Sequence, residues 1–222
     1  MKFLGKIFGL SLIWFGVWAF FIEVLQIQGI DYTNHYVITT VFFMLVITGL
    51  NSAFKDQIGT FVGKFTQKDL LTVSIFSAVM ALIYFLVNTF FIDPSGIDVS
   101  SYPFLLRMQE SFLVSKAFEI MFQQTFFIIC VYYLFNKNVA GWKNILSFGV
   151  FTLILHIPIL LVPDSMGKTL LISSFFAGVI FSYCITKFKK GFLYSFFIHY
   201  AFYVLLGAAW WLGFSEYVRF LI

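Results

Sequence analysis

The sequence predicts an all-α protein, a polytopic bundle of about seven transmembrane helices. Hydrophobic residues make up 61% of the 222 residues and charged residues only 11%, whereas soluble domains carry about 25% charged residues. The mean hydropathy is correspondingly high, at +0.95. Apolar runs long enough to cross a bilayer, which takes about 20 residues, recur along the whole chain. We therefore expect an integral membrane protein with membrane lipid as its surroundings.

Seven segments approach the spanning length. They cover 7–27, 36–54, 70–92, 112–135, 145–163, 168–186 and 191–213. Turn-forming and charged residues fill the gaps, as at 93–96, 136–138, 163–165 and 189–191. The first segment follows Lys2 and Lys6 in the manner of a signal peptide. It has no small-residue cleavage motif before Glu23, so we expect an uncleaved first helix.

The lysines and arginines predict the orientation of the bundle. Of the 14 such residues, ten lie in alternate gaps counted from the N-terminus, and three lie in the other gaps and the C-terminal tail. Lys116 is the remaining one and falls inside a segment. Positive residues gather on the cytoplasmic side of a membrane. The alternation therefore predicts a cytoplasmic N-terminus and supports the count of seven spans.

Two functional classes fit the sequence poorly. The net charge is +4, but the only dense basic group is Lys187, Lys189 and Lys190, which is better explained as a topology signal. We therefore expect no nucleic-acid partner. Cys130 and Cys184 both lie in apolar runs without a Cys-x-x-Cys spacing, so cysteine-based metal or redox chemistry is not expected.

Three ionisable residues, Glu119, His156 and His199, stand deep inside apolar segments. Such a residue costs a few kcal/mol in a bilayer unless it faces a partner or water, and it is a functional-site candidate for that reason. From the predicted orientation, Glu119 and His156 lie about 10 Å below the outer boundary, and His199 lies deeper.

Each candidate has polar neighbours about one helical turn away on the same face of its predicted helix. These neighbours are Lys116 and Gln123 for Glu119, Thr152 for His156, and Ser195 and Tyr203 for His199. A polar stripe on an otherwise apolar helix is expected to face the interior of the bundle. The three stripes together predict one intramembrane site.

Short motifs surround the three residues. They read Phe-Glu-Ile-Met-Phe-Gln over 118–123, Thr-Leu-Ile-Leu-His over 152–156 and His-Tyr-Ala-Phe-Tyr over 199–203. In order and spacing, the stretch from about 115 to 205 resembles the CPBP (Abi) family of intramembrane proteases, which includes the CAAX prenyl endopeptidases. The signatures of that family are Glu-Glu-x-x-x-Arg, Phe-x-x-x-His and His-x-x-x-Asn. The resemblance covers about 90 residues and implies a bacterial cytoplasmic-membrane protein.

The motifs depart from the family at four positions. Phe118, Gln123, Thr152 and Tyr203 stand where the family has glutamate, arginine, phenylalanine and asparagine. Moving the first motif by one residue makes Glu119 the leading glutamate and places Gln124 at the arginine position. Both registers remain open from the sequence.

The resemblance implies hydrolysis of membrane-embedded or juxtamembrane peptides. Glu119 and His156 would activate a water molecule, and His199 with Tyr203 would stabilise the oxyanion, supported by Gln123 and Thr152. No cofactor is expected in this scheme. A zinc ion held by Glu119, His156 and His199 is an alternative, because two imidazoles and a carboxylate form a known ligand set.

Each of the three residues also has a purely structural explanation. Glu119 would form a neutralised pair with Lys116, and His156 would bond a backbone carbonyl in a helix loosened by Pro158. His199 would make a polar contact between helices.

Two other functions of the whole protein are also compatible with the sequence. A degraded site predicts a non-catalytic membrane partner, such as an immunity or scaffold protein. A proton-linked transporter is a third hypothesis, although the sequence lacks the internal repeat typical of carriers. We divide the chain into a three-helix region, 1–110, and a CPBP-like four-helix core with a short tail, 111–222.

Overall fold

The fold is an all-α bundle, as the sequence predicts. A computed structural model describes residues 2–30, 32, 34–63, 66–90, 109–135, 141–161, 165–209 and 211–212. Every regular element within these ranges is helical. The predicted turns at 93–96 and 136–138, the Pro163-Asp164 pair and the tail after residue 212 lie outside the described residues.

Six segments of the described chain are long and apolar enough to cross a membrane. They belong to α1 (Lys2–Phe20) with its π-helical continuation η1 (Phe21–Gln26), α2 (Tyr36–Ala53), α4 (Gln67–Phe90), α5 (Glu110–Phe135), α7 (Ser165–Lys187) and α8 (Gly191–Ala209). The chain is therefore a polytopic integral membrane protein. Each of the six overlaps one of the predicted segments.

The remaining predicted segment, 145–163, forms a composite element. Helix α6 (Trp142–His156) has 15 residues, and a 3₁₀ helix, η4 (Ile157–Leu161), continues it. Pro158 lacks the N–H that an α-helix would use there, which accounts for the tighter helix after His156. Helix α6 alone is about 22 Å long at 1.5 Å per residue, short of the roughly 30 Å hydrocarbon core. Its crossing of the membrane therefore depends on η4 and stays a prediction.

One further helix, α3 (Lys55–Val62), lies in the interval that the sequence assigns to a gap at 55–69. It buries Ile58, and Gln57 donates a hydrogen bond to the Tyr133 hydroxyl at 3.0 Å. With only 8 residues it is shorter than the window of about 11–18 residues over which apolar periodicity predicts a helix.

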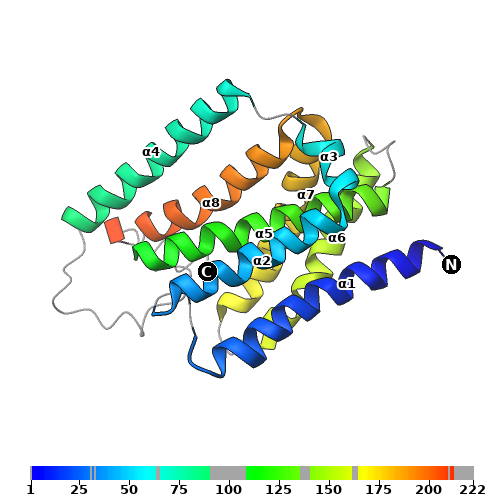
Figure 1. The fold of residues 1–222 in the computed structure, drawn as a ribbon, viewed down its shortest axis with the longest axis horizontal. Coiled ribbons are helices and arrows are strands. Elements are labelled where there is room, and N and C mark those ends of the chain that lie inside the picture. Colours follow the sequence, from blue (N-terminus) through cyan, green and yellow to red (C-terminus); the bar gives the residue numbers. More distant parts are fainter. Residues whose placement is uncertain are drawn as a thin grey trace.

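Helix α5 is the central element of the bundle (Figure 1). In its apolar stretch 67% of the residues are buried, against 6% in α4. Phe122, Phe126 and Phe127 of α5 are at most 1% exposed, and their rings surround the indole of Trp14 from α1 at 5.3–6.0 Å. The core draws on both predicted regions, 1–110 and 111–222, and the division between them stays a prediction.

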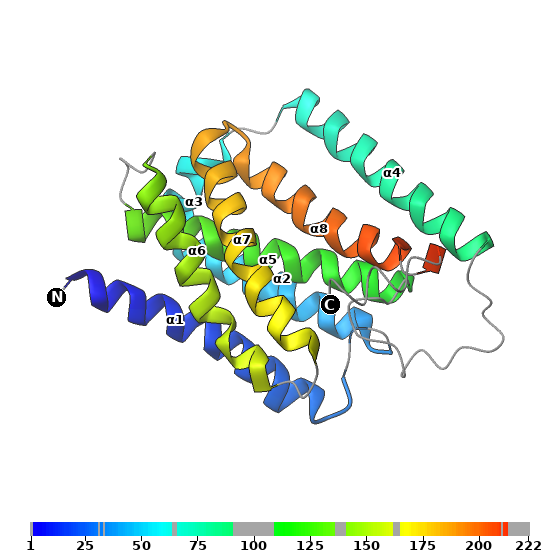
Figure 2. The same cartoon turned by 180° about the vertical axis from the view of Figure 1, so that it is seen from behind.

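Helices α6 and α7 pack tightly against each other and lie in front of α5 in the view of Figure 2. A Cβ atom on Gly149 would come within 2.6 Å of Val179, and one on Gly178 would collide with the Thr152 side chain. Small residues allow two membrane helices to approach this closely. The site residue Thr152 is held in place by this contact.

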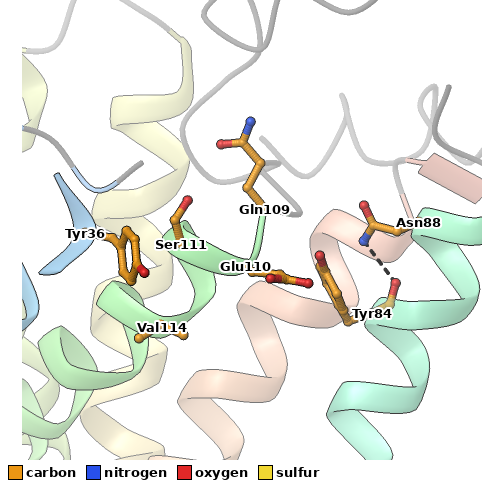
Figure 3. A pocket seen from close by; sticks show the side chains of 7 residues that line it. All are labelled: Tyr36, Tyr84, Asn88, Gln109, Glu110, Ser111 and Val114. Carbon is orange, nitrogen blue, oxygen red and sulfur yellow. Dashed lines mark hydrogen bonds between the residues drawn. The ribbon is translucent and has the colours of Figure 1, made fainter. Parts of the chain in front are cut away.

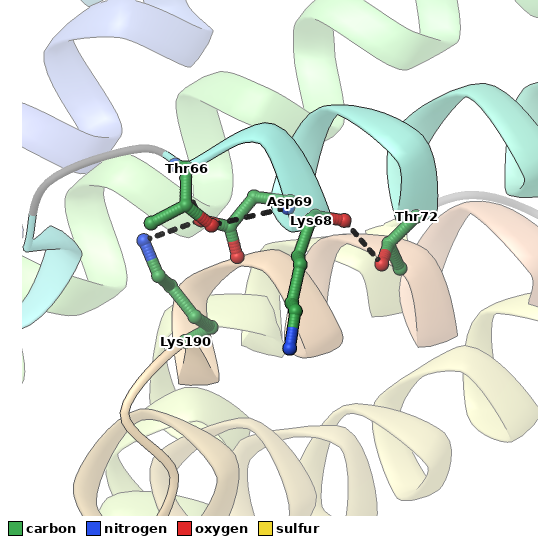
Figure 4. Close-up of polar contacts among 5 residues, drawn as sticks. All are labelled: Thr66, Lys68, Asp69, Thr72 and Lys190. Carbon is green, nitrogen blue, oxygen red and sulfur yellow. Dashed lines mark hydrogen bonds and ion pairs between the residues drawn. The ribbon is translucent and has the colours of Figure 1, made fainter.

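Helix α4 lies at the edge of the bundle beside α8 (Figure 1). Phe76 stacks on Phe197 with ring centroids 4.1 Å apart. At the start of α4, Asp69 accepts hydrogen bonds from the backbone N–H and hydroxyl of Thr66 and pairs with Lys190 at 2.9 Å (Figure 4). Thr66 and Asp69 form a capping box, and Lys190 ties this cap to the turn between α7 and α8.

Candidate functional site

The polar stripe of α5 faces the interior of the bundle. Lys116 is 3% exposed, Glu119 1% and Gln123 6%. Thr152, Ser195 and Tyr203, which lie beside the two histidines, are also buried. The three predicted stripes therefore point inward, as their polarity requires.

Donors occupy both oxygens of the Glu119 carboxylate. Lys116 Nζ lies 2.7 Å from Oε2, and Gln123 Nε2 donates to Oε1 at 2.6 Å. Lys116 Nζ also stands 4.3 Å from the centroid of the Tyr203 ring on α8, a cation–π distance. A lysine that is itself buried thus has both a carboxylate and an aromatic face around its charge.

Tyr32, from the connection between α1 and α2, covers this ion pair. It is 3% exposed, and its hydroxyl lies within hydrogen-bonding reach of Glu119. Burial, followed by the nearby Glu119 carboxylate, raises the pKa of Tyr32 well above its usual range. The hydroxyl therefore stays protonated and available as a donor. Ser115 on α5 donates to the Tyr32 carbonyl at 3.2 Å and holds the connection against the helix.

His156 bonds to its own helix. Its Nδ1 lies 2.8 Å from the Thr152 carbonyl oxygen, which can only accept, so Nδ1 carries the proton and Nε2 of the neutral ring is an acceptor. Trp14 packs against the ring at 5.5 Å and donates to the Leu155 carbonyl at 3.2 Å. Trp14 also stacks on Phe122 of α5, so its indole contacts both the His156 ring and the central helix.

His199 contacts α5 through Gln124. His199 Nδ1 lies 3.1 Å from Gln124 Nε2, and the ring packs between Phe181 at 4.9 Å and Tyr203 at 5.5 Å. With the amide nitrogen as donor, Nδ1 accepts and the neutral ring carries its proton on Nε2. Gln124 is fully buried, and its Oε1 has no hydrogen-bond partner among the described residues. Rotating the amide by 180° would reverse both roles.

The structure thus gives Glu119, His156 and His199 separate partners. No hydrogen bond joins the Glu119 carboxylate to either imidazole within the described part of the chain. Thr152 and Ser195 also donate to carbonyls of their own helices, at 2.9 and 2.9 Å.

The zinc alternative has no geometric support. Glu119, His156 and His199 all lie in described ranges, yet no group of three His, Cys, Asp or Glu side chains in those ranges is close enough to hold a metal ion. Each of the three side chains has its own partner instead: Lys116 for Glu119, the Thr152 carbonyl for His156 and Gln124 for His199.

The sequence did not indicate three of the site's contacts. Trp14 and Tyr32 come from the N-terminal region, outside the stretch that carries the motifs. No local pattern links either of them to residues more than 80 positions away. Gln124 entered only through the alternative register of the first motif. A fully buried glutamine on a central helix is the signal that could have singled it out.

Comparisons with known proteins return no match. No family model, no curated protein and no solved structure matches the chain. The resemblance to the CPBP family therefore depends on the three motifs alone.

Proposed function

We propose that this chain is a CPBP-like membrane protein that acts without catalysis, as a partner of a membrane-embedded or juxtamembrane peptide or protein. The observation that carries the proposal is that each oxygen of the Glu119 carboxylate already has a donor on its own helix, Lys116 at 2.7 Å and Gln123 at 2.6 Å. A general base needs a lone pair directed at the water whose proton it removes. Here Lys116 and Gln123 each engage one oxygen of the carboxylate, and His156 and His199 bond to Thr152 and Gln124 instead of sharing a water site with it.

The departures from the family motifs support the same conclusion. Gln123 replaces the arginine in one register, and it contacts Glu119 as a neutral donor. Tyr203 replaces the asparagine, and its ring faces the Lys116 ammonium at 4.3 Å. Residues that the family would use on a substrate are thus directed at the ion pair. The polar cluster then serves to fix α5 against α8 and the α1–α2 connection.

A cleavage assay tests this proposal. Purified protein in lipid nanodiscs is incubated with quenched fluorescent peptides that carry an apolar, membrane-inserting segment. Wild type, Glu119→Ala and His156→Ala should show the same background rate. A wild-type rate that both substitutions lower at least tenfold would overturn the proposal. The melting temperature of each preparation controls for loss of the fold.

A peptidase is the second candidate, and the tautomers of the histidines favour it. His156 presents Nε2 as an acceptor, as a residue that orients water must, whereas His199 with Gln124 as donor presents an N–H, as an oxyanion requires. In this alternative Lys116 must leave the carboxylate before water can be activated. Replacing Lys116 by methionine would then raise the cleavage rate, whereas the non-catalytic proposal expects no cleavage by this variant.

The proposal also includes the orientation of the protein and the membrane in which it lies. The alternation of lysines and arginines supports a cytoplasmic N-terminus, and the family resemblance supports a bacterial cytoplasmic membrane. The exposed aromatic residues of α4, including Phe85 at 59% and Phe90 at 69%, provide a surface for a membrane-embedded partner. Nothing in the described geometry favours a proton-linked transporter over these two candidates.

A further inference from the structure

A polar cavity opens between α4 and the beginning of α5, away from the Glu119 cluster (Figure 3). Its volume is about 470 Å³, within the range of about 300–1,000 Å³ typical of small-molecule sites. The residues that line it are Tyr36, Tyr84, Asn88, Gln109, Glu110, Ser111 and Val114. Among the described residues that line it, Val114 alone has no polar side-chain atom. Such a cavity on an otherwise apolar surface calls for a ligand with a polar group.

Glu110 provides the charge of this cavity. Its side chain points across to Tyr84 on α4 (Figure 3). No lysine, arginine or histidine of the described ranges forms an ion pair with Glu110, whereas Asp69 and Glu119 each have a lysine partner. The helix dipole favours a carboxylate in the first turn of a helix, and this explains why a glutamate stands at position 110. It does not account for the cavity around it.

The side-chain amide of Gln109 adds an acceptor to the cavity. Gln109 Oε1 is shielded from solvent and has no partner within the described part of the chain. Asn88 already uses its amide nitrogen to donate to the Tyr84 carbonyl at 3.0 Å. The aromatic rings of Tyr36 and Tyr84 stand on either side of Glu110 (Figure 3). Acceptors, a negative charge and aromatic rings together match a cation that carries N–H donors.

We propose that this cavity binds a primary ammonium group, such as the headgroup of an aminophospholipid. An ammonium has one positive charge and three donors, which would pair with Glu110, Gln109 Oε1 and a tyrosine. Helix α4, which contributes Tyr84 and Asn88 to the cavity, also exposes the apolar side chains of Phe85 and Phe90, at 59% and 69%. An acyl chain can follow this surface from the cavity. The inference does not depend on whether the Glu119 cluster is catalytic.

Native mass spectrometry of the full chain tests the proposal. Protein is reconstituted with equal amounts of phosphatidylethanolamine, which carries the ammonium, and phosphatidylglycerol, which does not. Wild type should retain phosphatidylethanolamine selectively. Glu110→Gln should lower that affinity about tenfold, the loss expected for one charge-assisted hydrogen bond. Equal retention of both lipids by wild type, or unchanged selectivity in Glu110→Gln, would overturn the proposal.

Two further variants separate binding from folding. Glu23→Gln is the matched control, because Glu23 is an exposed carboxylate outside the cavity, and it should retain the lipid as wild type does. Gln109→Leu removes the unpaired acceptor and should weaken retention without lowering the melting temperature. Retention unaffected by Gln109→Leu, or reduced equally by Glu23→Gln, would contradict the assignment.

A soluble amine then identifies the source of the group. Displacement of the lipid by millimolar ethanolamine, but not by glycerol, would support a site that recognises the ammonium alone. Selective retention that ethanolamine cannot displace would support a site that also requires the acyl chains. Equal displacement by ethanolamine and glycerol would overturn recognition of the charge.

Discussion

Lys116 and Glu119 form the most consequential residue pair of this protein. A buried carboxylate or ammonium costs several kcal/mol, and their mutual contact at 2.7 Å offsets that cost. The sequence identified both residues and offered two explanations for Glu119, as a base and as a partner of Lys116. The structure favours the second through the added donors Gln123 and Tyr32. The choice depended on rotamers and on a distant connection, neither of which a helical spacing contains.

Breaking the pair should destabilise the protein strongly. Lys116→Met leaves the Glu119 charge buried without its ammonium, and we expect a loss of about 3–5 kcal/mol in the free energy of unfolding. The double variant Lys116→Met/Glu119→Leu removes both charges and should recover most of that stability. Unfolding in mild detergent, followed by circular dichroism, measures both. A double variant as unstable as Lys116→Met alone would contradict this account of the pair.

The two histidines show how far residue types alone can predict a site. Their helices and their inward direction followed from polar stripes in the sequence. Their partners did not, because Trp14 reaches His156 from 142 positions away and Gln124 reaches His199 across 75. Such contacts are set by the packing of whole helices.

At the scale of elements, the sequence located the long helices well because each is an uninterrupted apolar run of spanning length. It predicted that Pro158 loosens the helix of segment 145–163, and in the structure α6 ends at His156 and continues as the 3₁₀ helix η4. It missed α3, which is short, and the π-helical turn of η1, which has no sequence signature in an apolar segment. The close packing of α6 on α7 was also beyond prediction, since a glycine in a helix does not reveal its neighbour.

Gly178 should be intolerant of a larger side chain. In Gly178→Val the new Cβ would collide with Thr152 and push α7 away from α6. We expect a loss of about 1–3 kcal/mol or more from overpacking, measured as a lowered melting temperature. Gly16→Val is the matched control, because Gly16 lies in α1 with open space around it. A control that loses as much stability as Gly178→Val would show that helix propensity, and not packing, is responsible.

At the scale of the whole molecule, α5 is surrounded by the other helices, and α4 lies at one edge. Composition was enough to predict a membrane bundle, because 11% charged residues cannot cover a soluble protein of this size. Composition could not show which helix is central. The high burial of α5 follows from its contacts with α1, α2, α3, α7 and α8.

The number of spans can be tested by locating the two ends of the composite element formed by α6 and η4. Reporter fusions after residues 140 and 163 should lie on opposite sides of the membrane, the first cytoplasmic and the second outside, if the composite element crosses it. A fusion after residue 30 should also lie outside. Fusions after 140 and 163 on the same side would reduce the bundle to the six spans that are long enough without η4.

The central proposal is that Lys116 and Gln123 hold the Glu119 carboxylate in a structural role and that the protein acts without hydrolysing peptides. The most direct measurement incubates the reconstituted protein with a mixture of membrane-derived peptides in H₂¹⁸O. Any peptidase activity places ¹⁸O in each new C-terminus, whatever the cleavage site. We predict the same ¹⁸O incorporation for wild type, Glu119→Ala and an empty-membrane control. Incorporation by wild type that disappears in Glu119→Ala would contradict the account.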